Sequence, residues 1–165
     1  MEIAELLAQK GVIKPLEENP EDEADRCLKC DYMCNKCTEV CPNRANIAIK
    51  VRSKHLRDHY QIIHLDNLCN ECGNCETFCP YRGKPYKDKF TLFSDERDFK
   101  KSSASGVYFR DINNGLVRYL GEEGEFCDND GFLVEDKAGN EIFLSPELVD
   151  IIRAVGSNYN YLLKL

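Results

Sequence analysis

Nine of the ten cysteines fall in two short segments, and their spacing indicates what chemistry they perform. The second segment contains Cys69, Cys72, Cys75 and Cys79 in the pattern C-x2-C-x2-C-x3-C, followed directly by Pro80. Bacterial ferredoxins use this run to hold cubane iron–sulfur clusters through cysteine thiolates. Three cysteines spaced two residues apart wrap one loop around a cube, with backbone N–H groups pointing at its sulfur atoms. The segment therefore predicts a [4Fe-4S] site.

The first segment repeats the end of that pattern. Cys34, Cys37 and Cys41 follow the spacing C-x2-C-x3-C, and Pro42 comes directly after them. Two further cysteines, Cys27 and Cys30, precede this repeat. The repeat predicts a second [4Fe-4S] cluster, as in two-cluster ferredoxins, where the last cysteine of each run binds the other run's cluster.

This crossed rule assigns the ligands. The second cluster takes Cys41, Cys69, Cys72 and Cys75. The first cluster takes Cys34, Cys37, Cys79 and one more cysteine from the start of the first segment. The standard position for that fourth ligand is residue 31, which is an aspartate. Cys30 is the nearest thiol and the expected ligand, with Cys27 as the alternative. The predicted metal-binding set comprises Cys27, Cys30, Cys34, Cys37, Cys41, Cys69, Cys72, Cys75 and Cys79.

Other chemistries of cysteine fit this spacing less well. A structural zinc site uses C-x2-C pairs far apart in the sequence. A secreted disulfide scaffold is shorter and follows a signal peptide. Cys30, Cys34 and Cys37 have the spacing of the radical S-adenosylmethionine motif. Those enzymes need a large barrel, which a chain of 165 residues does not supply.

Charge and hydropathy bound the partners and the compartment. The net charge is −7 and the pI is near 5.1, which argues against nucleic acid as the main partner. The longest apolar runs are a few residues long, too short to span a bilayer. The N-terminus is acidic and lacks the basic region of a secretory signal, so a cytoplasmic location is expected.

The flanking elements predict an α+β fold, with a two-cluster bacterial ferredoxin-like core, an N-terminal helix, and a C-terminal small β-meander plus helix. Residues 47–51 and 61–65 are expected to be paired strands on either side of a polar insertion. We expect three parts: an N-terminal helix and acidic connector over 1–26, a two-cluster ferredoxin-type domain over 27–85, and a β-meander with a closing helix over 86–165.

In the last part, turn residues separate four predicted strands, at 106–110, 116–120, 131–135 and 141–144. Ser145, Pro146 and Glu147 then form the start signal of a helix. This part has no catalytic constellation, so no catalytic residue is predicted. The isolated Cys127 is interpreted as core packing, and His64 as a strand residue near the clusters rather than a proton carrier.

Several short motifs resemble the C-terminal ferredoxin-type region of the family labelled "putative selenate reductase subunit". They are Arg26-Cys27-Leu28, Cys41-Pro-Asn-Arg-Ala-Asn46, Leu68-Cys-Asn-Glu-Cys-Gly-Asn-Cys75, Lys89-Phe-Thr-Leu-Phe93 and Arg153-Ala-Val155. Proteins of that family carry a flavin and pyridine-nucleotide module, similar to the glutamate synthase small subunit, ahead of this region. This chain has no Gly-x-Gly-x-x-Gly run, so that module is expected on a partner.

The resemblance implies an electron-transfer role within an oxidoreductase complex. The partner would be a flavoprotein NAD(P)H oxidoreductase, within an assembly of the molybdenum-hydroxylase or electron-bifurcating type. Flavin and NAD(P)H would then be bound by the partner and not by this chain. The alternative is a structural or assembly module, in which the clusters hold a small fold together and the meander forms the interface.

Overall fold

The computed structural model describes residues 34–56 and 58–164. The predicted N-terminal helix, the acidic connector, Cys27 and Cys30 lie outside these residues. Within them, no helix is long and apolar enough to cross a membrane.

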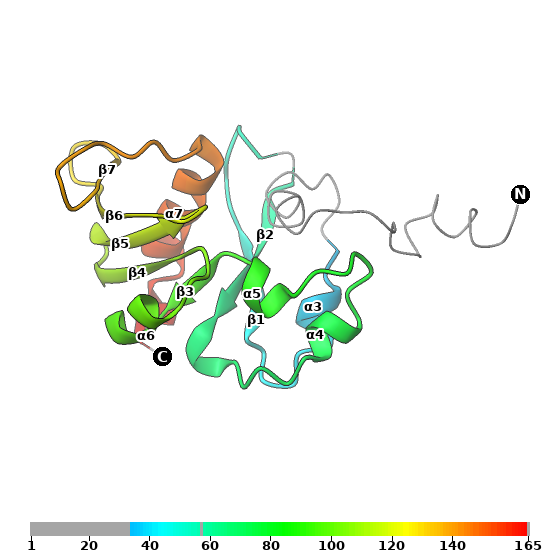
Figure 1. The fold of residues 1–165 in the computed structure, drawn as a ribbon. Coiled ribbons are helices and arrows are strands. Elements are labelled where there is room, and N and C mark those ends of the chain that lie inside the picture. The colour runs from blue at the N-terminus through cyan, green and yellow to red at the C-terminus, as the bar shows by residue number, and fades with distance from the viewer. Residues whose placement is uncertain (1–33, 57, 165) are drawn as a thin grey trace, which may run out of the picture.

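Seven strands form one mixed sheet in which the order of the strands follows the order of the chain (Figure 1). The strands are β1 (Asn46–Lys50), β2 (Tyr60–Leu65), β3 (Thr91–Phe93), β4 (Gly106–Asp111), β5 (Asn114–Tyr119), β6 (Glu122–Cys127) and β7 (Leu133–Glu135). The β2–β3 and β3–β4 pairs are parallel, and the other four pairs are antiparallel. The expected pairing of the first two strands is therefore present, with Asn46 opposite His64.

Short helices connect the strands, and a longer one follows the last. They are α3 (Lys36–Glu39), the 3-10 helix η1 (Asp66–Leu68), α4 (Asn74–Thr77), α5 (Pro85–Asp88), α6 (Glu96–Lys101), α7 (Pro146–Asn158) and the 3-10 helix η2 (Asn160–Lys164). The predicted start of α7 is confirmed, because the Ser145 side chain accepts a hydrogen bond from the N–H of Leu148, and Pro146 occupies the first turn.

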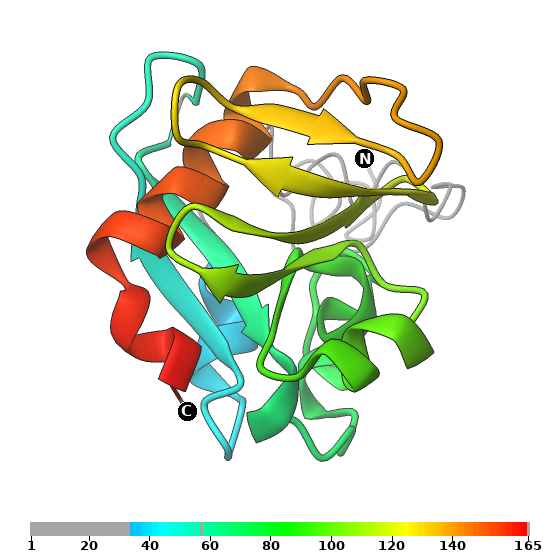
Figure 2. The ribbon, with the colours of Figure 1, turned by 90° about the vertical axis from the view of Figure 1, so that its left-hand side faces the viewer.

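Helix α7 lies against one face of the sheet and forms the main hydrophobic core with it (Figure 2). Its buried stripe is Leu148, Ile151, Ile152, Ala154 and Val155. Because side chains alternate between the faces of a strand, every second residue of each strand reaches this core. The residues of the sheet that do so include Ile49, Ile63, Leu65, Val107, Phe109, Val117, Phe126 and Val134.

The other face carries the cysteine loops. Ile62 on β2 packs with Cys37 and Cys75, next to Val40 and Tyr86. Further along the same face, α6 packs on the sheet through Phe99, which meets Phe93 edge to face at a ring separation of 5.3 Å. The sheet therefore separates α7 on one side from the cysteine segments on the other.

The meander differs from the sequence prediction in two places. Residues 122–127 form β6 between β5 and β7, although no strand was expected there. The predicted strand at 141–144 was wrong, since Glu141 makes an isolated bridge to Glu135 and no strand follows. The turn that starts β6 runs through Leu120 and Gly121, which both have positive φ. A leucine in that conformation gives no turn signal in the sequence.

Strand β3 and helix α6 were also not predicted, and they join the cysteine loops to the meander. Gly106 of β4 pairs with Thr91 of β3 at a very close approach. A Cβ atom at Gly106 would lie 2.3 Å from the Thr91 carbonyl oxygen and 2.6 Å from the Phe93 ring. Glycine is therefore required at this position to allow the parallel pairing.

We expect Gly106→Ala to lower the free energy of unfolding by about 1–3 kcal/mol, because the added methyl forces β3 and β4 apart. Urea denaturation followed by circular dichroism measures the change. Ser103→Ala, at an exposed position three residues earlier, is the control and should change the free energy by less than about 0.5 kcal/mol. Equal stability of the two variants would show that the strands tolerate the methyl group.

Candidate cluster-binding site

Four of the predicted ligands line a single pocket. Cys41, from the loop after α3, meets Cys69 and Cys72, from the loop between η1 and α4, and Cys75 of α4 itself. The pocket is completed by Asn43, Asn46, Asn70, Glu71, Gly73 and Tyr86. We call it the four-cysteine pocket. It brings together the set that the crossed rule assigned to one cluster, from segments nearly thirty residues apart.

Three of these four sulfur atoms accept hydrogen bonds from N–H groups. The backbone N–H of Ala45 donates to Cys41 Sγ at 3.2 Å, and that of Glu71 donates to Cys69 Sγ at 3.3 Å. The Glu71 backbone reaches this position with φ at +52°. The thiol of Cys75 is bonded by the backbone of Tyr86 and the side chain of Asn46. Such donors stabilise negative charge on sulfur.

Burial raises the pKa of the Cys69 and Cys75 thiols. The hydrogen bonds from Glu71 to Cys69, and from Tyr86 and Asn46 to Cys75, lower it in part, and the neighbouring Cys41 raises it again. Without a bound metal centre the thiols are therefore protonated at neutral pH. Because a thiol must lose its proton to ligate a metal, metal binding at this pocket releases protons.

The two cysteine segments fold alike, as their sequence repeat predicts. Helices α3 and α4 lie side by side (Figure 1), and the equivalent cysteines Cys37 and Cys75 are both buried. Three residues after the last cysteine of each run stands an arginine in the left-handed conformation, Arg44 with φ +55° and Arg82 with φ +57°. Non-glycine residues seldom adopt this conformation. Its occurrence at both equivalent positions shows that the repeat extends to the backbone turn after each proline.

The other predicted cluster site is described in part. Cys34 and Cys79 are partly exposed, and Cys37 is buried beside Cys75 and Ile62. The proposed fourth ligand, Cys30, and its alternative, Cys27, lie outside the described residues. Among the residues that the structure covers, no group of three or more His, Cys, Asp or Glu side chains is arranged to hold a single metal ion.

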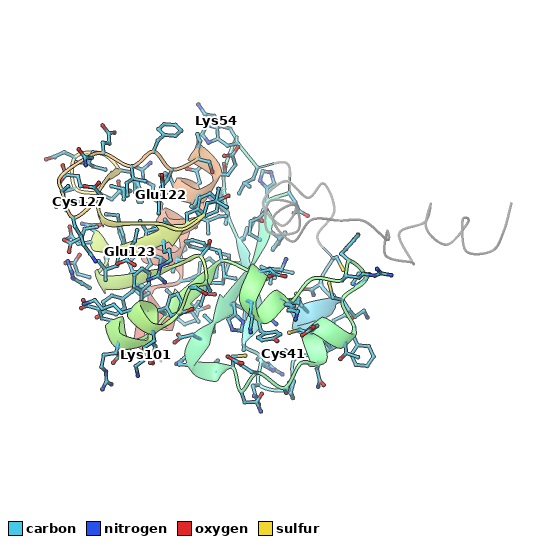
Figure 3. All side chains as sticks on the ribbon, in the orientation of Figure 1. Cys41, Lys54, Lys101, Glu122, Glu123 and Cys127 are labelled. Atoms are coloured by element: carbon cyan, nitrogen blue, oxygen red, sulfur yellow. The ribbon has the colours of Figure 1, made fainter. Side chains whose placement is uncertain are left out.

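The tenth cysteine stands apart from these loops. Cys127 is the last residue of β6, and Figure 3 shows it among the meander strands, well separated from Cys41. Its sulfur accepts a hydrogen bond from Asn129 Nδ2 at 3.3 Å. Cys127 is partly exposed and belongs to none of the hydrophobic clusters of the described residues, so its interpretation as core packing is not confirmed.

Two polar residues behind the pocket have no signal in the sequence that marks them as part of a site. Asn46 and His64 are 2% and 3% exposed, and Asn46 Oδ1 lies 2.9 Å from His64 Nδ1. Asn46 Nδ2 donates to the carbonyl oxygen of Cys37 at 3.3 Å. Burial lowers the pKa of His64 to about 4, so its ring is neutral at neutral pH. The strand register places the two side chains together, and sequence spacing alone does not reveal that register.

The chain is similar to a segment of two longer bacterial proteins. It is 39% identical to a protein of Escherichia coli O157:H7 and 38% identical to one of Escherichia coli strain K12, both named "Putative oxidoreductase YgfK". Each comparison covers 97% of this chain and 16% of the relative. The names of these relatives support a redox role in general terms. No family model and no solved structure matches the chain.

Proposed function

We propose that the chain is an iron–sulfur electron-transfer protein or subunit that relays single electrons through two [4Fe-4S] clusters. The observation that carries the proposal is the four-cysteine pocket, in which Cys41, Cys69, Cys72 and Cys75 converge from the two cysteine segments. In this proposal they bind one cluster. Cys34, Cys37, Cys79 and Cys30, or Cys27 in place of Cys30, bind the other.

The pocket fits a cubane better than a zinc ion. One zinc ion holds all its thiolates about 2.3 Å from a common centre. No group of three or more potential ligands in the described residues has an arrangement suited to one ion. A cubane spreads its thiolates over separate irons and takes N–H donors at its sulfur ligands. Ala45, Glu71, Tyr86 and Asn46 supply such donors here.

The exposure of the pocket suits electron exchange with another protein. Cys72 is exposed, so one edge of a cluster at this pocket would lie close to the surface. Electrons would pass between a flavoprotein NAD(P)H oxidoreductase and another redox centre, within a molybdenum-hydroxylase-type or electron-bifurcating complex. The net charge of −7 favours a basic docking surface on such a partner. The cytoplasm, where thiols remain reduced, is the compartment that suits this chemistry.

The alternative function is a cluster-stapled structural or assembly module. The continuous sheet gives it some support, because β3 joins the cysteine loops to the meander, so that a cluster would also brace the meander. The two functions differ in redox behaviour. An electron carrier is reduced and reoxidised repeatedly without loss of iron, whereas a structural cluster has no need to change its oxidation state.

We expect anaerobically purified protein to contain about eight iron and about eight acid-labile sulfide atoms per chain, with no stoichiometric zinc. Repeated reduction by a flavoprotein reductase with NAD(P)H, followed by reoxidation, should leave the iron content unchanged. Iron without reversible reduction would favour the structural module. Zinc in place of iron would refute electron transfer by this chain.

A further inference from the structure

His64 is a buried side chain with one bonded and one free ring nitrogen. It projects from β2 directly opposite Asn46 of β1, on the sheet face that carries the cysteine loops. Its Nδ1 lies 2.9 Å from Asn46 Oδ1, and this is the bond that the imidazole makes within the described part of the chain. The residue is 3% exposed. The second ring nitrogen, Nε2, makes no hydrogen bond to the described residues.

The bonds of Asn46 determine the tautomer of His64. Asn46 Nδ2 donates to the carbonyl oxygen of Cys37, and the side chain also bonds the thiol of Cys75. The amide nitrogen therefore faces the cysteine loops and the amide oxygen faces His64. An amide oxygen accepts hydrogen bonds, so the hydrogen of the neutral ring lies on Nδ1 and Nε2 carries a lone pair.

His64 also lines a second cavity. No fully buried side-chain nitrogen or oxygen in the described residues lacks a hydrogen-bond partner, so the unbonded Nε2 must be reached by solvent. His64 lines a cavity of about 390 Å³ that also contacts Cys69. We call it the His64 cavity. The titratable groups that face it are Asp66, Glu71, Tyr86, Asp98 and Lys101. Figure 3 labels Lys101, which faces the His64 cavity, and Cys41, which lines the four-cysteine pocket.

The two pockets therefore communicate through one hydrogen-bonded path. It runs from the Cys75 thiol to the Asn46 amide, then to the His64 imidazole, and ends at Nε2 in the His64 cavity. Glu71, Tyr86 and Cys69 line both pockets and form the wall between them. Asn46 and His64 thus lie between a cluster ligand and a cavity that contains acidic groups.

We propose that His64 takes up a proton at Nε2 when the cluster bound by Cys41, Cys69, Cys72 and Cys75 accepts an electron. This inference rests on the proposed function. The electron comes from the partner flavin, or from dithionite in the test, and lowers the charge of the cluster by one. The proton comes from the buffered bulk solvent, which reaches the ring through the His64 cavity, and raises the charge of the imidazole by one. The net charge of the buried region is then unchanged.

Three physical features favour the uptake of this proton. Burial lowers the pKa of the imidazole to about 4, which favours the neutral ring before reduction. Negative charge gained by a nearby cluster stabilises the imidazolium, since charges interact strongly away from bulk water. Three acidic residues, Asp66, Glu71 and Asp98, face the cavity against one basic residue, Lys101. Burial raises the pKa of Tyr86, which keeps its hydroxyl uncharged. The Nδ1–H bond to Asn46 is kept in both protonation states.

The test is the midpoint potential of the cluster-loaded protein measured against pH by anaerobic redox titration. In the wild type one cluster should become harder to reduce as pH rises above the His64 pKa of the oxidised protein. Between the His64 pKa of the oxidised protein and that of the reduced protein, the midpoint potential should fall by about 59 mV per pH unit for one electron, which is a tenfold change in the reduction equilibrium. Above the His64 pKa of the reduced protein this slope should disappear. His64→Gln should abolish this slope, and His59→Gln, at an exposed position outside the path, should retain it.

Asn46→Asp is the second variant, because its carboxylate still accepts the bond from Nδ1 and favours the imidazolium. It should move the pH-dependent range upward while keeping the slope. If His64→Gln fails to fold, nuclear magnetic resonance of the wild-type His64 ring must show a higher pKa in the reduced than in the oxidised protein. A pKa that does not change with oxidation state, or an unaltered slope in His64→Gln with full iron content, would overturn the inference. Loss of iron in the wild type would instead contradict the proposed function.

Discussion

Replacing Cys75 by serine will lower the iron content of anaerobically purified protein from about eight to about four atoms per chain. Cys75 is buried in the four-cysteine pocket and receives hydrogen bonds from Tyr86 and Asn46. Serine is a weaker ligand for iron than a thiolate, so the cluster at this pocket would lose one of its four thiolate ligands. One cluster should be lost while the other remains. Iron and sulfide analysis, with the visible absorption of the clusters, measures the change.

Cys127→Ser is the matched control. Cys127 carries the same side chain but lies at the end of β6, bonded to Asn129, so its replacement should leave the iron content unchanged. Equal iron content in the Cys75 and Cys127 variants would remove Cys75 from the ligand set. The same assay applied to Cys27→Ser and Cys30→Ser decides which of these two cysteines completes the other cluster.

The spacing of the cysteines was the most informative part of the sequence. The ferredoxin run and its repeat predicted which four thiols share a pocket, and Cys41 joins Cys69, Cys72 and Cys75 as the crossed rule requires. The repeat also predicted the similar folds of the two segments. These features could be predicted because the short distances between Cys69, Cys72 and Cys75 along the chain keep them at one site, and the crossed rule adds Cys41 from the other segment.

The strands were predictable where apolar residues mark them. Ile47 and Ile49 of β1, and Ile62, Ile63 and Leu65 of β2, gave those strands their signal. Strand β6 reads Glu-Glu-Gly-Glu-Phe-Cys, and Phe126 is its one fully buried large apolar side chain. Its stability comes from pairing with β5 and β7 and not from its own composition, so the sequence alone did not reveal it.

The polar groups behind the pocket show a second limit of sequence reasoning. His64 was expected to be a strand residue near the clusters rather than a proton carrier. It does lie on β2, whereas our proposal that it takes up a proton departs from the second half of that expectation. Its bond to Asn46 depends on the register of β1 and β2, and its access to a cavity depends on the packing of η1, α5 and α6. Side chains that meet through tertiary packing leave no mark on the linear spacing of residues.

Among substitutions of buried residues in the meander, we expect Arg118→Leu to cause the largest loss in the free energy of unfolding. Arg118 projects from β5 and is 8% exposed. Its guanidinium donates to the carbonyl oxygens of Phe99 at 2.9 Å and Ser102 at 2.7 Å, which end helix α6, and to Glu123 Oε2 at 2.6 Å. It also lies 4.3 Å from the centre of the Phe99 ring. Leucine would leave two carbonyl groups and a half-buried carboxylate without these donors.

The expected cost of Arg118→Leu is about 3–5 kcal/mol, since two carbonyl groups and the partly buried Glu123 carboxylate lose their donor. Urea denaturation of cluster-loaded protein under anaerobic conditions measures it. Arg110→Leu is the matched control, because Arg110 of β4 also pairs with a glutamate of β6, Glu125. That pair is 42% and 64% exposed, so its loss should cost no more than about 1 kcal/mol. Similar losses in the two variants would mean that the bonds to the α6 carbonyls add no stability, and that α6 is held on the sheet by Phe99 and Phe93 alone.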